Sequence, residues 1–324
     1  MVEKTREFTE RGGGRMKTEI TSFLEKYEQR ILGQNINLRL LLSAILSGGH
    51  VLLEGVPGTG KTQMVRTLAN LLGGDFNRIQ FTPDLLPSDI TGSTIYNMKE
   101  STFQTLKGPI FTNILLADEI NRTPAKTQAA LLEAMEEKQV TIQGETYPLP
   151  EVFFVVATQN PIEFEGTYPL PEAQQDRFLF KLLIDFPSFD EEKNVLKRVI
   201  ESSFDENYGS AILDMDTFIS IRKEIESVTV GESVLNYMMQ IVRKTRDSES
   251  IRFGASTRAG ISIGKAAQAW AYLAGRNYVT PDDIKMVAKP ALRHRIQLSP
   301  HVELEGATVD QIIEELVGSV PVPR

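Results

Sequence analysis

The sequence contains no cysteine and only three histidines, His50, His294 and His301, no two of which are four residues apart. Without cysteine the chain has no disulfide, no thiolate nucleophile and no cysteine-ligated zinc or iron–sulfur site. The scattered histidines argue against a histidine-rich metal site. This composition is compatible with a reducing compartment, although it does not require one.

Long hydrophobic runs are also missing. The apolar stretch 152–157 and the broken run 38–53 fall short of the roughly 18 residues needed to span a bilayer. Residues 1–16 are charged and have no apolar centre, which is not the pattern of a secretory signal. We therefore expect a cytoplasmic protein with no transmembrane segment. Residues 1–15 are interpreted as a flexible leader, with a regulatory tail as the alternative.

Positive charge is in deficit, because 35 Lys and Arg stand against 43 Asp and Glu and give a net charge of −8. This balance argues against a generally basic nucleic-acid binder, although a local basic patch is compatible with it. The 41% of hydrophobic residues is ordinary for a globular protein and excludes a disordered, collagen-like or coiled-coil chain. The length of 324 residues predicts about two domains, or one large α/β unit with an appendage.

Short apolar strands alternate with helices in the first part of the chain. Strands are predicted at 50–54, 78–81, 114–117, 152–157 and 178–184, and helices at 17–27, 35–46, 61–72 and 124–138. This alternation favours a parallel sheet covered by helices on both faces. Beyond Pro187 helices are predicted at 190–202, 215–228, 232–246, 257–274 and 281–289, with loops at 205–213 and 247–256. We therefore expect an α/β domain over 16–187 and an all-helical domain over 188–324.

A glycine-rich segment follows the first predicted strand and opens a helix, and it matches the pattern G-x-x-x-x-G-K-[ST]. Its glycines let backbone N–H groups turn toward a phosphate, and the helix N-terminus adds a positive dipole. The lysine can reach the β- and γ-phosphates, and the last hydroxyl can ligate Mg²⁺. A glycine-rich turn with an incidental lysine is the alternative. The predicted nucleotide-binding residues are Gly55, Val56, Pro57, Gly58, Thr59, Gly60, Lys61 and Thr62.

Two carboxylates, Asp118 and Glu119, follow the apolar strand at 114–117. Ligands gather at the carboxyl edge of an open parallel sheet. Asp118 is therefore a candidate ligand for Mg²⁺ together with Thr62. Glu119 is a candidate general base that orients and polarises an attacking water. Plain charged residues at a strand end are the alternative.

A third strand, 152–157, ends in the polar segment Thr158, Gln159 and Asn160, followed by Pro161. An amide at this edge can contact the γ-phosphate or fix the attacking water, and Asn160 is the predicted residue. The alternative is that Asn160 and Pro161 only form a turn.

The order of these features resembles the AAA+ ATPases. Four segments are similar to the MoxR family within that group: IQFTPDLLPSD at 79–89, ADEINRTP at 117–124, ATQNP at 157–161 and GASTR at 254–258. The resemblance runs from about residue 17 to about residue 300. One departure is Thr257, where the family commonly has proline. The resemblance implies a P-loop NTPase core with a C-terminal helical lid.

The resemblance also implies roles for single residues. Asn160 matches sensor 1, Arg177 matches the arginine finger that reaches a neighbouring subunit, and Arg258 matches sensor 2 on the lid. Gln34 ends the segment 31–34, where such proteins hold the adenine. A two-stranded insertion is expected near 84–105 and a hairpin at about 139–151. By themselves, Arg177 is also compatible with a surface ion pair and Arg258 with a solvated charge at a helix start.

The function implied by the resemblance is ATP hydrolysis with Mg²⁺ at the interfaces of a ring, most readily a hexamer. Such proteins act like chaperones on client proteins, often with a von Willebrand factor A-type partner. A nucleic-acid translocase is a rival hypothesis, but the segments 84–105 and 139–151 carry five acidic residues against one lysine, Lys99. A non-catalytic scaffold is the other rival, and it predicts loss of Glu119, Asn160 or Arg177, all of which are present. A GTPase is a lesser rival, since no Asn-Lys-x-Asp motif was found.

Overall fold

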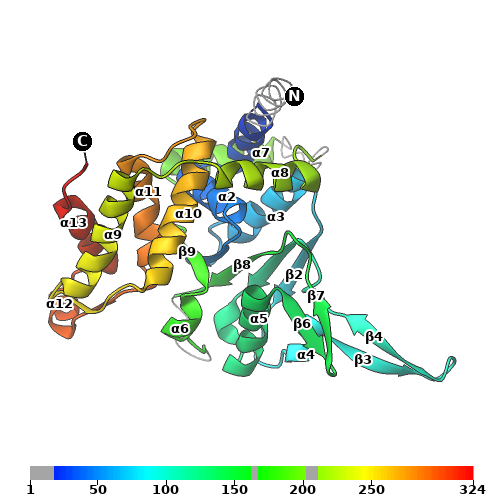
Figure 1. Cartoon of the computed structure of the whole chain (residues 1–324). Helices are drawn as coiled ribbons and strands as arrows, with labels where there is room; N and C mark the ends of the chain where they lie inside the picture. The colour runs from blue at the N-terminus through cyan, green and yellow to red at the C-terminus, as the bar shows by residue number, and fades with distance from the viewer. Residues whose placement is uncertain (1–17, 162–166, 202–210, 324) are drawn as a thin grey trace, which may run out of the picture. The chain divides into compact units, whose positions relative to one another are not determined.

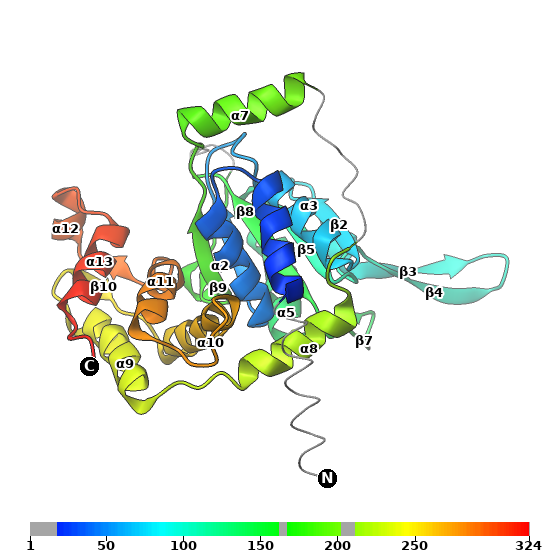
Figure 2. The ribbon, with the colours of Figure 1, turned by 90° about the horizontal axis from the view of Figure 1, so that it is seen from above.

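The computed structural model describes residues 18–161, 167–201 and 211–323 (Figures 1 and 2), so the leader expected over residues 1–15 lies outside the described residues. The chain divides into two compact units. The sheet unit comprises 48–69 and 74–185, and the helical unit comprises the described parts of 1–47, 70–73 and 186–324. The change of unit at Asp185 and Phe186 lies next to the expected division at 187, while residues 18–47 group with the helical unit. The domain limits 16–187 and 188–324 stay a prediction.

The centre of the sheet unit is a five-stranded parallel sheet with the strand order β2-β5-β8-β1-β9. The predicted parallel α/β fold is confirmed. Its strands are β1 (His50–Glu54), β2 (Phe76–Gln80), β5 (Ile114–Asp118), β8 (Phe154–Gln159) and β9 (Phe178–Leu183). Gln80 pairs with Asp118, and Glu54 pairs with Gln159. Because the strands are parallel, these last residues lie along one edge of the sheet.

Every residue of β5 is buried. Successive side chains of a strand point to opposite faces, so a strand that is buried throughout must be covered on both sides. On one face Leu115 and Ala117 join a core with Val155 of β8 and with Leu131 and Leu132 of helix α5 (Ala125–Glu137). The apolar run at 114–117 is therefore continuous because both faces of β5 are buried. A strand with one exposed face would alternate apolar and polar residues instead.

The remaining elements of the sheet unit are helices α3 (Lys61–Leu72, of which 70–72 group with the helical unit), α4 (Pro87–Thr91), η1 (Ile120–Arg122) and α6 (Glu172–Gln175), and two antiparallel hairpins. The hairpins are β3 (Gly92–Asn97) with β4 (Thr102–Lys107) and β6 (Gln139–Ile142) with β7 (Glu145–Pro148). The β3–β4 hairpin extends away from the five-stranded sheet (Figures 1 and 2). The insertion expected near 84–105 thus starts with a short helix, and its strands run to Lys107.

The helical unit contains a helix over residues 18–30 and the helices α2 (Asn35–Leu46), α7 (Phe189–Ile200), α8 (Met215–Glu226), α9 (Glu232–Asp247), α10 (Thr257–Leu273), α11 (Pro281–Leu292), α12 (Pro300–Leu304) and α13 (Val309–Ser319). Helix α10 packs against α2, α9 and α11 (Figure 1). The seven consecutive residues 40–46 of α2 are all buried, whereas Ile36 and Arg39 in its first half are exposed. Burial around the whole second half explains why this helix packs among other helices. Among the residues that the structure describes, no helix could cross a bilayer.

One sequence expectation for this unit is wrong. The loop expected at 247–256 contains strand β10 (Ile251–Phe253), which pairs antiparallel with β11 (Gln297–Leu298). Strands of two or three residues are too short to show a period of two, and their pairing joins segments more than forty residues apart. The pattern of apolar residues in the sequence therefore does not indicate β10 and β11. Most of the other loop, expected at 205–213, lies outside the described residues.

His50 begins β1 in a fully buried position that suits only a neutral ring. Its Nδ1 accepts a hydrogen bond from the Val155 N–H at 3.0 Å, so Nε2 carries the proton and faces the Met135 carbonyl at 3.3 Å. Burial lowers the pKa of His50 from 6.5 to about 4, and the hydrogen bond to Met135 only partly opposes this shift. The ring therefore contributes stability in its neutral form.

We predict that this contribution is complete above pH 6.5 and is lost as the pH falls from 6.5 toward 4, because the unfolded chain takes up the proton first. The size is about 3 kcal/mol for a shift of this extent. In a His50→Gln variant the amide cannot titrate in this range. Urea unfolding between pH 7 and pH 4 should therefore show the stability gap between wild type and variant narrowing by that amount. Parallel curves would contradict the prediction.

Candidate functional site

The glycine-rich segment forms a loop between β1 and α3. Its glycines are required for two different reasons, close packing at one position and backbone conformation at two others. A Cβ at Gly55 would lie 2.3 Å from the backbone oxygen of Ile184, so the close approach of two chain segments excludes any side chain there. Gly58 and Gly60 have φ angles of +84° and +81° and open space where a Cβ would be. These left-handed conformations favour glycine. They leave the backbone N–H groups of the loop accessible to an anion.

Lys61 is the first residue of α3, and its side chain bends back over the loop. The Nζ atom donates to the carbonyl oxygens of Gly55 and Val56, each at 2.7 Å. Partial burial lowers the pKa of Lys61, while the carboxylates of Asp118 and Glu119 raise it. The ammonium therefore lies between the loop and the acidic pair.

Asp118 ends β5 and is held through both carboxylate oxygens. Its Oδ1 accepts from the Thr158 hydroxyl at 2.5 Å. Its Oδ2 accepts from Arg78 Nε at 3.1 Å and Nη2 at 2.7 Å, and from the Thr62 hydroxyl at 3.4 Å. The carboxylate is buried, so these donors replace the water that it loses on folding. Asp118 and Thr62, the two predicted Mg²⁺ ligands, thus lie within hydrogen-bond distance of each other.

Glu119 leaves the strand with φ 58° and ψ 50°, a left-handed conformation that is costly for a residue with a side chain. Its N–H donates to the Thr158 hydroxyl at 2.8 Å, which holds this conformation. Its Oε2 accepts from Gln80 Nε2 at 2.7 Å and lies 3.4 Å from Arg122 Nε. Local backbone strain of this kind persists at functional sites because the surroundings enforce it.

Asn160 follows β8 and is buried, and its carbonyl oxygen accepts from Asn121 Nδ2 at 3.2 Å. The residue before it, Gln159, donates to Glu54 Oε2, and Lys181 forms an ion pair with the same oxygen at 2.7 Å. These contacts tie the end of β8 to the residue that precedes the glycine-rich loop. The position of Asn160 beside the loop is therefore built by neighbouring strands.

The loop and the strand ends enclose one cavity of about 450 Å³. Predicted residues that it brings together are Pro57, Gly58, Thr59, Gly60, Lys61, Thr62, Asp118, Glu119 and Asn160, and unpredicted ones are Gln63, Arg66, Thr158 and Gln159. Gly55 and Val56 do not line it, but their carbonyl oxygens accept hydrogen bonds from Lys61. Thr158 and Gln80 stand inside the segments that carried the family resemblance, but only the fold shows their contacts with the acidic pair.

Besides Gly55 and Val56, three predicted residues are not among those that line this cavity. Arg177 forms an ion pair with Glu136 of α5, with Nε 3.0 Å from Oε2, as the surface-ion-pair alternative expected. Gln34 is buried at the start of α2 and accepts from Asn37 Nδ2 at 2.7 Å. Arg258 lies exposed in the first turn of α10. Gln34 and Arg258 belong to the helical unit, and their contacts with a nucleotide stay a prediction.

The chemistry of this cavity fits a nucleotide and a divalent cation. Hydroxyl and carboxylate oxygens of Thr62 and Asp118 are ligands that Mg²⁺ prefers. The loop N–H groups, the N-terminus of α3, Lys61 and Arg66 suit the charge of phosphates. The lining of the cavity thus combines acidic oxygens with basic and backbone N–H groups.

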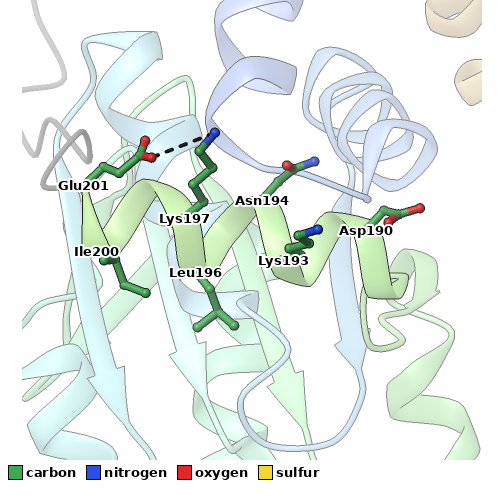
Figure 3. Close-up of a pocket in the computed structure, with 7 residues that line it drawn as sticks. All are labelled: Asp190, Lys193, Asn194, Leu196, Lys197, Ile200 and Glu201. Atoms are coloured by element: carbon green, nitrogen blue, oxygen red, sulfur yellow. Dashed lines mark ion pairs between the residues drawn. The ribbon is translucent and has the colours of Figure 1, made fainter.

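A second cavity, of about 640 Å³, runs along α7. Leu196 and Ile200 point to one side of this helix, while Lys197 and Glu201 point to the other and pair at 3.8 Å (Figure 3). All of its described lining residues come from this one segment, and Lys197 and Glu201 are more than half exposed. It has no convergent buried polar groups, so the smaller cavity at the sheet edge is the better candidate for chemistry.

Comparisons with known proteins cover both units. Residues 50–180 match the family described as "ATPase family associated with various cellular activities (AAA)", and residues 243–316 match the AAA lid domain. The uncharacterized protein YeaC of Bacillus subtilis is 51% identical over 93% of both chains. Chaperone MoxR1 of Mycobacterium tuberculosis is 43% identical over 91% of this chain and 80% of that protein. The crystal structure of a protein assigned as an ATPase from Cytophaga hutchinsonii is similar with a TM-score of 0.91, at 44% identity over 99% of both chains.

We predict that the Thr158 hydroxyl is needed for stability as well as for the site. A Thr158→Val variant keeps the shape but leaves the Glu119 N–H and Asp118 Oδ1 each without a buried partner. The free energy of unfolding should fall by about 1–3 kcal/mol, measured by urea denaturation. Thr158→Ser, which keeps the hydroxyl, is the matched control and should lose clearly less. Equal losses in the two variants would show that the hydroxyl has no such role.

Proposed function

Because this chain belongs to the MoxR family of AAA+ ATPases, we propose that it works as a ring-shaped, Mg-ATP-dependent motor that remodels or matures client proteins in the cytoplasm. The chain is an ATPase with a parallel-sheet core and a helical lid. The observation that carries the proposal is the convergence of Lys61, Thr62, Asp118 and Glu119 on one cavity.

Bound Mg-ATP supplies the phosphoryl group and a cation that offsets its charge. Thr62 and Asp118 would hold the cation through oxygen atoms, and the N–H groups of the loop residues other than Pro57, together with Lys61, would hold the phosphates. Lys61 gives up its contacts with the Gly55 and Val56 carbonyls to do so. In this proposal, binding requires side-chain movement rather than a change of fold.

Glu119 acts as the general base toward water. Glu119 lines the cavity together with Asn160. The hydrogen bond from its backbone N–H to the Thr158 hydroxyl fixes the backbone from which the side chain extends. Asn160 orients the water or contacts the transferring phosphoryl group. Removal of the water proton by a positioned carboxylate typically contributes about 10²–10⁴-fold to a rate.

Arg177 acts in the site of a neighbouring subunit. In this chain it pairs with Glu136, is absent from the described lining of the cavity, and has a side chain that is 29% exposed. A mobile arginine that reaches a transferring phosphoryl group is worth about 10³–10⁵ in rate. A site completed head to tail by the next copy requires a closed ring or a spiral, and we propose a hexameric ring. Gln34 at the adenine and Arg258 on the lid complete the proposed nucleotide contacts.

The β3–β4 hairpin supports a protein client rather than a nucleic acid. Its side chains Ile95, Tyr96, Met98, Phe103 and Leu106 are exposed, and Met98 is 87% exposed. Tyr96 and Phe103 form an edge-to-face pair with centroids 5.2 Å apart. An exposed apolar and aromatic surface fits protein chains, whereas a phosphate backbone needs positive charge. A von Willebrand factor A-type partner, implied by the family resemblance, belongs to the same proposal.

We predict that catalysis is shared between subunits. Glu119→Gln should keep ATP binding and abolish turnover, and Arg177→Ala should also abolish turnover. In an equal mixture of the two variants, about one interface in four pairs an intact Glu119 with an intact Arg177. A phosphate-release assay should therefore recover part of the wild-type rate.

The control for this mixture is the double variant that carries both substitutions. Mixed with either single variant, it offers no interface with both groups intact, so no activity should return. If the two single variants restore nothing when mixed, or if the double variant restores as much, the shared site is disproved.

We also predict that DNA does not stimulate the ATPase. The β3–β4 hairpin exposes several large apolar side chains, and its only basic residues are Lys99 and Lys107, so single- or double-stranded DNA should change the rate by less than about twofold at 0.1 M salt. The measurement is the steady-state rate with and without a 40-mer. A marked stimulation that salt abolishes would favour a nucleic-acid translocase instead.

A further inference from the structure

Arg78 lies on β2, the edge strand next to β5, and makes a two-pronged contact with Asp118. Both prongs go to the same oxygen, Oδ2. The other oxygen, Oδ1, is taken by the buried Thr158 hydroxyl. Oδ2 is also the oxygen that faces the Thr62 hydroxyl. The atom best placed to ligate a cation together with Thr62 is therefore the atom that Arg78 already holds.

A carboxylate oxygen offers about two lone-pair directions. Here Oδ2 receives two N–H groups of Arg78 and the Thr62 hydroxyl. A divalent cation at this oxygen needs one of those directions, so it must displace at least one prong of Arg78. A guanidinium and a metal ion also repel each other at such short range. Arg78 and the metal are competitors for one atom.

The two partners differ in their freedom to move. The side chain of Arg78 is 50% exposed, whereas that of Asp118 is 10% exposed. Arg78 Nη2 has a second partner in Gln80 Oε1 at 2.9 Å, on the same strand. Arg78 can therefore turn away while keeping one hydrogen bond, and Asp118 stays fixed by Thr158.

We propose that Arg78 is an internal counter-ion for Asp118 and sets the concentration of divalent cation at which the nucleotide site fills. The inference rests on the proposed function, because it assumes that Thr62 and Asp118 hold the cation. The proposal predicts that loss of Arg78 changes the affinity for the cation in the direction opposite to that expected for a purely structural role. A residue that merely positions Asp118 strengthens metal binding, whereas a competitor weakens it.

The test uses the full chain loaded with ADP and titrated with Mn²⁺, with the free ion followed by electron paramagnetic resonance. Arg78→Met removes the charged prongs and keeps a long side chain. The half-saturating Mn²⁺ concentration should fall by about three- to tenfold, the range expected for a charge-assisted pair that is partly exposed. Asp118→Asn in the wild-type and Arg78→Met backgrounds should weaken Mn²⁺ binding, which assigns the signal to this site.

Arg122→Met is the matched control, because it removes the same charge from beside Glu119 rather than from Asp118. Its Mn²⁺ titration should shift by less than about twofold, since Arg122 pairs with Glu119 and its charge acts on the cation only through screened electrostatics. An equal shift in both variants would mean general electrostatics and would overturn the inference. Thermal unfolding checks that each variant is folded. If Arg78→Met is not, Arg78→Gln carries the same test.

The titration distinguishes failure of this inference from failure of the proposed nucleotide site. If the ADP-loaded wild type binds Mn²⁺ and the Arg78 variants bind it equally or more weakly, Arg78 is not a competitor and only this inference falls. If the ADP-loaded wild type binds no Mn²⁺, the proposed Mg-nucleotide site falls, and the role of Arg78 falls with it. Tighter binding in the Arg78 variants alone supports the inference.

Discussion

The parallel pairing of β2, β5 and β8 is the constraint on which the site depends. In a parallel sheet every strand ends at the same edge, so residues that follow the strands meet although they are distant along the chain. The register places Gln80 beside Asp118 and continues from Ala117 to Ala157. Thr158 therefore reaches the carboxylate of Asp118 and the backbone of Glu119. If the register slipped by one residue, each of these side chains would point to the opposite face.

Charge within the cavity is compensated locally. Asp118 and Glu119 are met by Arg78 and Arg122, and Lys61 is held by loop carbonyls. Under the proposed function, Lys61 exchanges its carbonyl contacts for a phosphate and Asp118 exchanges a contact with Arg78 for a cation, and each group keeps its charge while it changes partners. The hydroxyl of Thr158 is buried and cannot be exchanged in this way. The site thus combines a fixed acceptor frame with cations that can move.

The two units contribute different things to the proposed activity. The sheet unit contains the phosphate loop, the acidic pair and Asn160, and its β3–β4 hairpin exposes apolar side chains. The helical unit contains Gln34 and Arg258. In the proposed activity the sheet unit therefore supplies both the phosphate site and the client surface, and the helical unit supplies the remaining nucleotide contacts.

The sequence by itself determined the chemistry that is local in the chain. The glycine-rich loop, the helix after it and the Asp118–Glu119 pair follow from spacing and from the need for φ angles and oxygen ligands at set positions, and the parallel sheet follows from buried apolar strands alternating with helices. Tertiary structure alone decided which side chains surround Asp118. Arg78, Gln80 and Thr158 lie on other strands. The residue pattern along one strand does not indicate which strand pairs with it in the sheet. The same reason hid the β10–β11 pairing and the ion pair of Arg177 with Glu136, since each joins residues that only the folded chain brings within reach.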